Sequence, residues 1–183
     1  MFIINTMDSY DTLLLSDNEI DRIKSYYDNK LNLITGDIRH HWGYHETNPT
    51  AWIYKLVDNL IKKNIGSEYS IYTRVTILKY IKGDYFLEHS DGSYNTYLDP
   101  NLSEHFYGGI EMSDSNDFVG GEFFKNGVVV PFKKGKINTH QFDEPHGVNE
   151  ITSGVRWSLQ FPIKWRYQTN LIYLEVFCFH IFI

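Results

Sequence analysis

The chain has 183 residues, of which 42% are hydrophobic and 22% charged, and its formal net charge is −6. This length and composition favour one soluble globular domain and argue against disorder over any long stretch. No basic block is longer than Lys62-Lys63 or Lys133-Lys134. Because nucleic-acid binders carry clustered positive charge, the acidic balance argues against a nucleic-acid partner.

The two ends of the chain and its single cysteine bear on location. Cys178 alone permits no intramolecular disulfide and no cysteine-based zinc site, which predicts a reducing, cytoplasmic setting. Residues 1–10 lack a basic segment followed by an apolar run, so no secretory signal is expected. Residues 171–183 are almost wholly apolar, but they are fewer than the roughly 20 of a usual membrane span and include Glu175 and His180. We expect a buried final strand or an oligomer contact here. A tail anchor or an aggregation-prone tail is the alternative, and the oligomeric state stays open.

A first helix is expected over residues 17–30. Ser16 and Glu19 have the spacing of a capping box, and Leu15 with Ile20 has that of a hydrophobic staple. Apolar residues then recur at helical spacing. These residues are Ile20, Ile23, Tyr27 and Leu31.

A second helix is expected to begin at Asn48-Pro49, which has the form of a cap followed by proline at the first helical position. Gly66 is placed to end this helix. The residues between them provide one apolar face. That face consists of Ile53, Leu56, Val57, Leu60 and Ile61.

From Tyr69 onward, short runs rich in β-branched and aromatic residues alternate with turn signals. Asn126-Gly127, between two such runs, predicts a tight hairpin. The expected strands cover residues 69–81, 85–89, 105–112, 122–125, 128–132, 137–142, 146–151 and 155–163. Two helices followed by these strands predict an α+β domain, with a β sandwich or barrel and the helices packed on one sheet.

The triplet His89-Ser90-Asp91 is the first candidate for chemistry. Residues two apart on an extended backbone project to the same face, so the imidazole and the carboxylate can converge. A third ligand would complete a two-histidine, one-carboxylate triad. Such a triad leaves open positions on iron(II) for a co-substrate and oxygen. The triplet alone has low specificity.

Other motifs surround this triplet in a fixed order. Residues 80–91 have the form Y-x-x-G-x-x-F-x-x-H-x-D, and residues 120–123 have the form G-G-E-hydrophobic. Further on, His146 is followed ten residues later by Arg156. Together these motifs resemble the prolyl-4-hydroxylase branch of the 2-oxoglutarate oxygenases, over residues 69–165.

The resemblance implies a double-stranded β-helix core, of the jelly-roll or cupin-like kind. It implies that His89, Asp91 and His146 are both the catalytic centre and the ligands of iron(II). We therefore expect one domain over residues 1–183, in which 1–68 give helical support, 69–165 form the catalytic core and 166–183 form the tail.

The resemblance also assigns the co-substrate. It implies that Arg156 binds the distal carboxylate of 2-oxoglutarate and that Tyr80 points into the barrel and hydrogen-bonds the co-substrate. A guanidinium is suited to this, because it recognises a carboxylate through two parallel hydrogen bonds. Ser158 alternates onto the same strand face as Arg156, where its hydroxyl can add a hydrogen bond. Arginine departs from the lysine of collagen-type enzymes, which argues against a collagen-like substrate.

The activity implied by the resemblance is that of a dioxygenase, which uses O2, hydroxylates a substrate and releases succinate and CO2. Ascorbate is a candidate reductant. A peptidyl residue, proline by family default, is the leading substrate. The alternatives are a free amino acid or other small molecule, and a non-catalytic β-helix binding module. Nucleic-acid demethylation by the same chemistry is disfavoured by the charge.

Three further segments have simpler interpretations. His40, His41 and His45 lack an acidic or cysteine partner at a zinc-site spacing, so we expect a loop packed against the barrel or part of its rim. Gly120-Gly121 is expected to form a turn rather than a phosphate cradle, because no helix pattern follows it. Residues 92–103 are polar and follow the metal ligands, so we expect a substrate-contacting loop or lid, with a plain connecting loop as the alternative.

Overall fold

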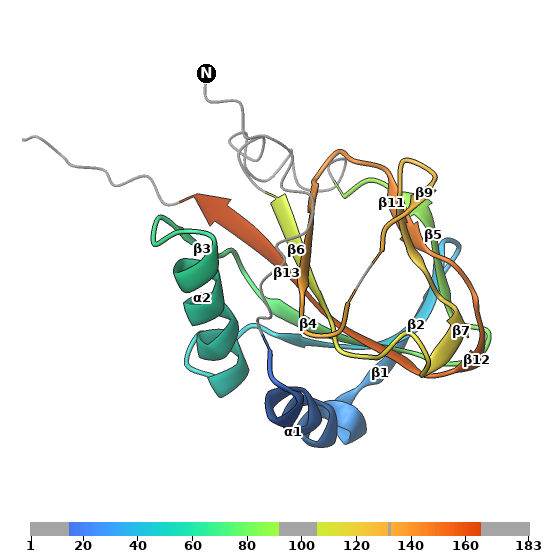
Figure 1. The fold of residues 1–183 in the computed structure, drawn as a ribbon, viewed down its shortest axis with the longest axis horizontal. Helices are drawn as coiled ribbons and strands as arrows, with labels where there is room; N and C mark the ends of the chain where they lie inside the picture. Colours follow the sequence, from blue (N-terminus) through green and yellow to red (C-terminus); the bar gives the residue numbers. More distant parts are fainter. Residues whose placement is uncertain (1–14, 92–105, 132, 166–183) are drawn as a thin grey trace, which may run out of the picture.

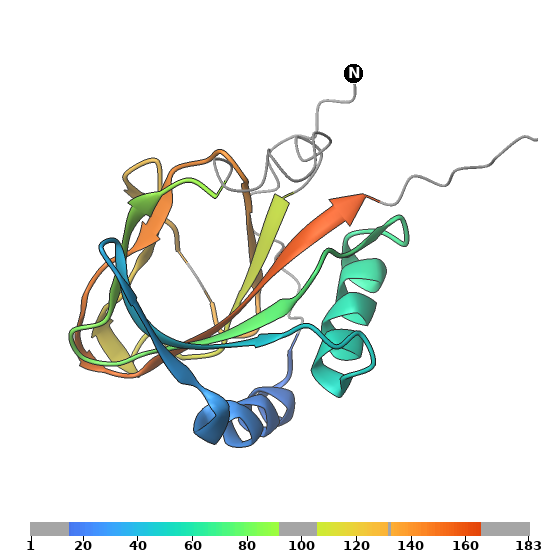
Figure 2. The same ribbon diagram turned by 180° about the vertical axis from the view of Figure 1, so that it is seen from behind.

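The computed structural model describes residues 15–91, 106–131 and 133–165. Their strands form a large antiparallel sheet that curls on itself, and two helices lie outside the curl (Figure 1, and from behind in Figure 2). The strands are β1 Asn32–Gly36, β2 Arg39–Glu46, β3 Tyr69–Ile71, β4 Val75–Tyr80, β5 Tyr85–His89, β6 Phe106–Glu111, β7 Phe118–Gly120, β8 Phe123–Lys125, β9 Val128–Val129, β10 Ile137–Gln141, β11 His146–Val148, β12 Ile151–Gly154 and β13 Arg156–Trp165.

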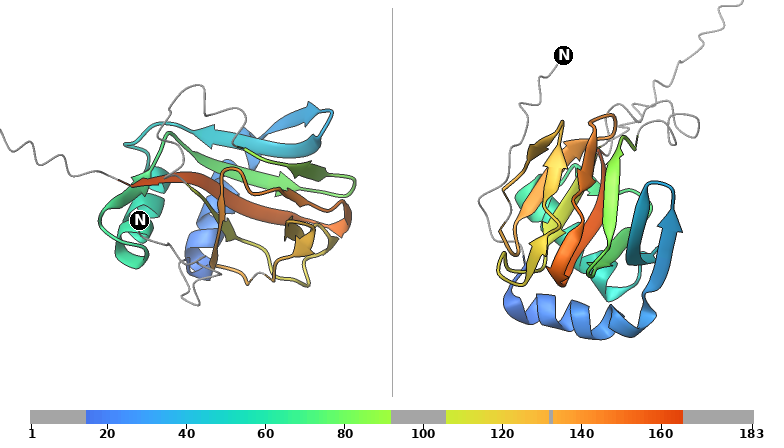
Figure 3. Two further views of the ribbon diagram at one scale, coloured as in Figure 1. Left: turned by 90° about the horizontal axis from the view of Figure 1, so that it is seen from above. Right: turned by 90° about the vertical axis from the view of Figure 1, so that its right-hand side faces the viewer.

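The order of strands in the large sheet is β10-β6-β13-β4-β2-β5-β11-β8-β9, with β1 beside β2 and β3 beside β13. β7 and β12 form a separate two-stranded sheet. Neighbours in space are seldom neighbours in sequence, so the sheet is held together by long-range pairing. The curled sheet with helices on one side confirms the predicted α+β class (Figure 3).

The first helix matches its prediction closely. α1 spans Asp17–Tyr27, and a 3-10 turn continues it over Asp28–Lys30. Ser16 Oγ accepts the backbone N–H of Glu19 at 3.4 Å, and the Glu19 carboxylate accepts the backbone N–H of Ser16 at 2.8 Å. Both halves of the capping box are therefore formed, and the residues of the staple are buried in the same core.

The second helix starts later than predicted. α2 spans Trp52–Asn64, and its N-cap is Ala51, which has no side-chain bond to offer. Asn48 instead accepts the backbone N–H and the hydroxyl of Thr50, at 2.9 and 2.8 Å. The asparagine therefore stabilises a turn before the helix rather than the helix itself, and the predicted start was wrong. The predicted apolar face is confirmed, with its buried residues being Ile53, Val57 and Ile61.

Strands β4 and β13 each contribute to two cores, because successive side chains alternate between the faces of a sheet. Odd-numbered residues such as Ile77 and Leu159 are buried against the helices. Even-numbered residues such as Tyr80 and Arg156 are buried on the opposite face, inside the curl. The helices thus cover the outer face of these strands, while the inner face carries polar groups.

The prediction of a loop around His40, His41 and His45 was wrong. These residues belong to β2, which lies between β4 and β5 in the sheet. His41 is buried, at 3% exposure, and faces inward as an apolar residue would. The imidazoles obscured the strand pattern, because a histidine reads as polar in a sequence even where its ring packs in a core.

The predicted hairpin is confirmed. β8 pairs with β9 through Lys125 and Val128, and Asn126-Gly127 forms the turn. Both turn residues have positive φ, 50° and 73°, as a type I′ turn requires. Gly120 and Gly121 also have positive φ, 77° and 68°, where β7 ends and the chain leads into β8.

Two predicted features lie outside the described residues: the substrate loop over 92–103 and the apolar tail over 166–183. The division of the chain at residue 68 stays a prediction, although the sheet takes in β1 and β2 from the first part. Within the described ranges, no helix has both the length and the apolar character needed to span a membrane.

The capping box gives a stability prediction. Ser16→Ala should lower the free energy of unfolding by about 1 kcal/mol, because it leaves a helix N–H without its acceptor. Ser25→Ala, at an exposed position within the same helix, is the control and should change it by less than about 0.5 kcal/mol. Urea unfolding measures both. Equal effects of the two substitutions would contradict the role of the cap.

Candidate metal centre

The pairing of β5 with β11 brings two histidines together. These strands are antiparallel, and His89 at the end of β5 lies directly opposite His146 at the start of β11. Asp91 follows β5 by two residues. One ligand atom from each of the three side chains lies within 4.8 Å of the others. The structure therefore brings together the three residues predicted as metal ligands.

Both histidines are held in the tautomer that metal binding needs. Nδ1 of His89 donates to the carbonyl of Leu87, and Nδ1 of His146 donates to the carbonyl of Glu144, each at 2.8 Å. A neutral ring that donates from Nδ1 carries its lone pair on Nε2. Both Nε2 atoms face Asp91, at 3.6 Å from its carboxylate oxygens. The local backbone thus orients both lone pairs before any metal arrives.

The protonation states also favour metal binding. Burial lowers the pKa of His146 to about 4, and the neighbouring His140 adds to this effect. Burial works to raise the pKa of Asp91, but His140 and His89 outweigh it and hold that pKa well below its ordinary value. A neutral imidazole beside an ionised carboxylate is the state in which both bind a divalent cation.

A third imidazole, that of His140, lies beside the triad. His140, on β10, is 6% exposed, and its Nε2 is 3.8 Å from an Asp91 oxygen. Its ring centre is 4.0 Å from that of His146 and 5.5 Å from the parallel ring of Tyr107. His140 and His146 approach the same carboxylate oxygen, Oδ2, whereas His89 approaches Oδ1, so His140 is placed to help orient the carboxylate.

The triad opens onto a cavity of about 140 Å³. Its walls come from β1, β2, β4, β5, β6, β11 and β13, so it lies inside the curled sheet. The residues that line it are Ile34, Arg39, His41, His45, Arg74, Thr76, Leu78, Phe86, His89, Asp91, Tyr107, His146 and Gln160. A cavity of this size accepts a group about as large as a benzene ring.

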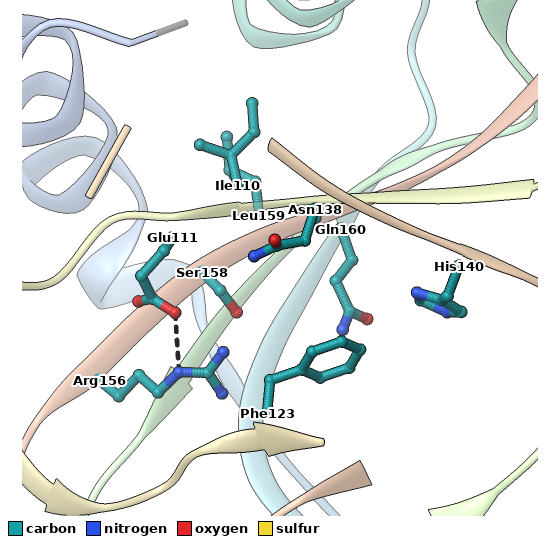
Figure 4. Close-up of a pocket in the computed structure, with 10 residues that line it drawn as sticks. Ile110, Glu111, Phe123, Asn138, His140, Arg156, Ser158, Leu159 and Gln160 are labelled. Carbon is teal, nitrogen blue, oxygen red and sulfur yellow. Dashed lines mark hydrogen bonds and ion pairs between the residues drawn. The ribbon is translucent and has the colours of Figure 1, made fainter. Parts of the chain in front are cut away.

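Arg156 lies deeper, beside a second cavity of about 30 Å³ that Ser158 and His140 also line. Figure 4 shows its guanidinium turned toward Glu111, and its Nε donates to the Glu111 carboxylate at 2.9 Å. Both residues are buried, at 5% and 3% exposure. Burial raises the pKa of the Glu111 carboxyl, and Arg156 works against that rise. Gln160 lines both cavities.

Tyr80 pairs with Arg156 across β4 and β13, and its ring lies 5.5 Å from the guanidinium carbon. The side chain is fully buried. Among the described residues, its hydroxyl has no hydrogen-bond partner. Since a buried hydroxyl without a partner costs about 1–3 kcal/mol, this atom fits a site that a polar ligand completes.

The three histidines of β2 do not form a metal site. His40 Nδ1 lies 2.6 Å from the buried carboxylate of Asp84, and His45 Nδ1 lies 3.0 Å from the Thr76 hydroxyl. His41 packs between the rings of Tyr80 and Phe86. Burial lowers the pKa of His41 to about 4, so its ring is neutral.

Four residues near the centre were missed in the sequence: Glu111, His140, Arg39 and Arg74. Glu111 ends a strand whose other positions are apolar or glycine, and an acid in such a run is a signal for a buried ionic partner. No comparable signal exists for His140 or for the arginines, because they meet the triad only through strand pairing.

No protein-family model matches the chain, and no curated protein sequence matches it. Solved structures do. A viral collagen prolyl hydroxylase from Paramecium bursaria Chlorella virus-1, in complex with 2-oxoglutarate, has a TM-score of 0.67 at 16% identity, covering 88% of this chain and 97% of that one. An oxidoreductase of the 2-oxoglutarate–Fe(II) oxygenase family from Burkholderia pseudomallei has a TM-score of 0.58 at 15% identity, covering 85% and 83%.

A third similar structure is a non-heme, 2-oxoglutarate-dependent epimerase from nogalamycin biosynthesis. Its TM-score is 0.63 at 11% identity, and the match covers 84% of this chain and 78% of that one. At these identities the similarities show the fold. The chain has the double-stranded β-helix fold of the 2-oxoglutarate and iron(II) oxygenases, as predicted, and it carries a His-Asp-His triad inside that fold.

The depressed pKa values give a pH prediction for the metal-free protein. Unfolded histidines titrate near 6.5, whereas His41 and His146 in the folded chain do so at about 4. Stability from the two neutral rings is therefore fully present above pH 6.5 and is lost as the pH falls toward 4. At about 1.4 kcal/mol per pKa unit, each ring contributes roughly 3 kcal/mol at most. Urea unfolding at pH 7 and pH 5 measures the loss.

A matched variant separates the two histidines. His41→Phe keeps an aromatic ring beside Tyr80 and Phe86 but removes one of the two titrating groups. It should lose less stability than the wild type between pH 7 and pH 5. The same loss in both proteins would mean that His41 titrates alike in the folded and unfolded chains.

Proposed function

We propose that this protein is an Fe(II)- and 2-oxoglutarate-dependent dioxygenase. The observation that carries the proposal is the triad, with two Nε2 lone pairs and one ionised carboxylate converging at the end of β5. Two imidazoles and a carboxylate on one face of the metal are the ligand set of non-heme iron(II) oxygenases. The fold supports the same assignment, since similar structures are 2-oxoglutarate oxygenases.

The co-substrate assignment rests on the inner face of β4 and β13. Arg156 offers a buried cation beyond the triad, Ser158 lines the same small cavity, and the buried Tyr80 hydroxyl lacks a partner within the described chain. We propose that these three residues hold 2-oxoglutarate, with Arg156 on its distal carboxylate. Because Glu111 already accepts from Nε, the carboxylate would approach the terminal nitrogens of the guanidinium.

When bound, iron(II) and 2-oxoglutarate supply the oxidation, in which O2 is consumed, succinate and CO2 are released and the substrate gains a hydroxyl group. The chain's own part is to bind and orient. The carbonyls of Leu87 and Glu144 fix the orientation of the two imidazoles. The ring of Phe86 stacks on that of His89, with the ring centres 3.9 Å apart, and shields that face of the imidazole from water. No side chain is required as a general base.

For the substrate we propose a peptidyl residue, with proline as the family default, and the viral prolyl hydroxylase of similar fold supports this choice. The epimerase of similar fold supports the alternative, a free amino acid or other small molecule. Ascorbate as reductant and a cytoplasmic location stay predictions. A binding module without catalysis is the remaining alternative, and an intact triad argues against it.

Anaerobic titration with iron(II) and 2-oxoglutarate tests the cofactor assignment. The wild type should develop the weak visible metal-to-ligand charge-transfer band. His89→Ala and His146→Ala should abolish it while the far-ultraviolet circular dichroism stays unchanged. His45→Ala is the matched control, because His45 lines the same cavity outside the triad, and it should keep the band. A folded wild type that never shows the band would favour the binding module.

The same band tests Arg156. Arg156→Ala should raise the 2-oxoglutarate concentration needed for half-maximal absorbance by about 10- to 100-fold, because a charge-assisted hydrogen bond pair is lost. Arg22→Gln, on the exposed side of α1, should leave the concentration unchanged. An unchanged requirement in Arg156→Ala would assign that carboxylate to another residue.

A further inference from the structure

Two arginines line the triad cavity without belonging to the proposed cofactor machinery. Arg39 is the first residue of β2, and Arg74 directly precedes β4. Both are wall residues of the cavity that contains His89, Asp91 and His146. In a chain whose net charge is −6, two arginines thus line the cavity in which the reaction is proposed to occur, the exposed Arg39 and the half-buried Arg74.

Arg74 is the better enclosed of the two. Its Nε is buried and has no hydrogen-bond partner within the described chain. Burial lowers the pKa of His45 and raises that of Tyr107, two other wall residues, and the charge of Arg74 adds to the first shift and opposes the second. A buried donor without a partner costs about 1–3 kcal/mol, so a ligand that accepts from it would recover that cost.

The backbone residue just before Arg74 has a strained conformation. Thr73, immediately before it, has a φ of +88°, which a β-branched residue rarely adopts. Such strain typically costs 1–3 kcal/mol and persists where the surrounding structure determines the direction of a functional side chain. Here the strained residue immediately precedes Arg74, which lines the cavity.

Neither arginine has an acidic partner in the described ranges 15–91, 106–131 and 133–165, where no salt bridge joins Arg39 or Arg74 to an acid. The guanidinium carbon of Arg39 instead lies 6.0 Å from the centre of the Phe86 ring. Arg156 differs, because Glu111 lies on its Nε. Among the residues that the structure describes, Arg39 and Arg74 are thus the arginines lining the triad cavity, and no salt bridge pairs either of them.

We propose that Arg39 and Arg74 bind a carboxylate of the primary substrate and so place its reacting carbon beside the metal. This inference rests on the proposed function and adds the substrate class to it. Guanidinium groups recognise carboxylates through charge-assisted hydrogen bonds, and two of them on one cavity fix an orientation. A volume of about 140 Å³ admits a group of single-residue size. The substrate is thus a free amino acid, or a peptide residue close to a carboxylate.

Nuclear magnetic resonance of the arginine Nε–H groups tests the proposal directly and does not depend on catalytic turnover. The full chain is labelled with 15N-arginine and loaded with zinc(II), a redox-inactive ion, and with 2-oxoglutarate. Acetate and L-proline are then titrated while the Nε–H signals are recorded. Acetamide and L-prolinamide, which lack the carboxylate, are the matched controls. Arg74→Gln identifies the signal of Arg74 by its loss.

The Arg74 signal should shift and saturate with acetate and L-proline, and it should not move with the two amides. Arg39→Gln should weaken acetate binding about tenfold, as read at the Arg74 signal, whereas Arg22→Gln should not change it. A stronger response to L-proline than to acetate would indicate a free amino acid. A response to acetate alone would indicate a carboxylate on a peptide. The proposal is overturned if the Arg74 signal does not shift at saturating acetate, or if it shifts by the same amount with acetamide.

A second measurement separates this proposal from the assignment of the cofactor. In Arg74→Gln, the 2-oxoglutarate requirement of the charge-transfer band should equal that of the wild type. A rise like that expected for Arg156→Ala would mean that the two arginines hold the co-substrate, and it would overturn the substrate proposal while leaving the oxygenase intact. If the wild type shows no band, the proposed function fails, yet the acetate titration with zinc(II) still reports on Arg39 and Arg74.

Discussion

The antiparallel pairing of β5 with β11 is the constraint on which the rest of the site depends. It sets His89 opposite His146, and the two residues after β5 bring Asp91 between their Nε2 atoms. A shift of the pairing by one residue would turn one imidazole to the other face of the sheet and remove the centre. The Nδ1 bonds to backbone carbonyls then act on rings that the strands have already placed.

The two helices influence the site without contacting it, through their packing on the outer face of the sheet. They bury the odd-numbered side chains of β4 and β13, and this burial fixes which face of each strand turns inward. Because side chains alternate along a strand, the inward face must then carry Tyr80 on β4 and Arg156 with Ser158 on β13. The apolar packing that stabilises the domain therefore also selects the polar groups that line its interior.

The charges inside the curl are arranged in two groups. The deep group consists of Arg156 and Glu111, both buried, and their direct contact limits how a further carboxylate can approach the guanidinium. The outer group consists of Arg39 and Arg74, which share the larger cavity with the triad. The two groups thus provide separate cations for the proposed co-substrate and for the proposed substrate carboxylate.

Local sequence patterns determined the parts of this protein that short-range physics decides. The capping box at Ser16, the apolar face of α2, the Asn126-Gly127 hairpin and the spacing of His89 and Asp91 each depend on residues a few positions apart. The start of α2 was predicted wrongly, because the Asn48 side chain accepts a hydrogen bond from Thr50 in a turn that precedes the helix. Resemblance to a known family, rather than the pattern alone, pointed to His146 and Arg156.

Only the tertiary structure could place β2 between β4 and β5, or bring His140, Glu111, Arg39 and Arg74 to the centre. These contacts join strands far apart in the chain, and nothing in a residue's immediate neighbours encodes which distant strand it will meet. A histidine or arginine in a strand has the same local signature whether it faces solvent or a cavity. The sequence therefore determined most of the elements and the candidate ligand motif, while long-range pairing decided which charges surround the candidate metal centre.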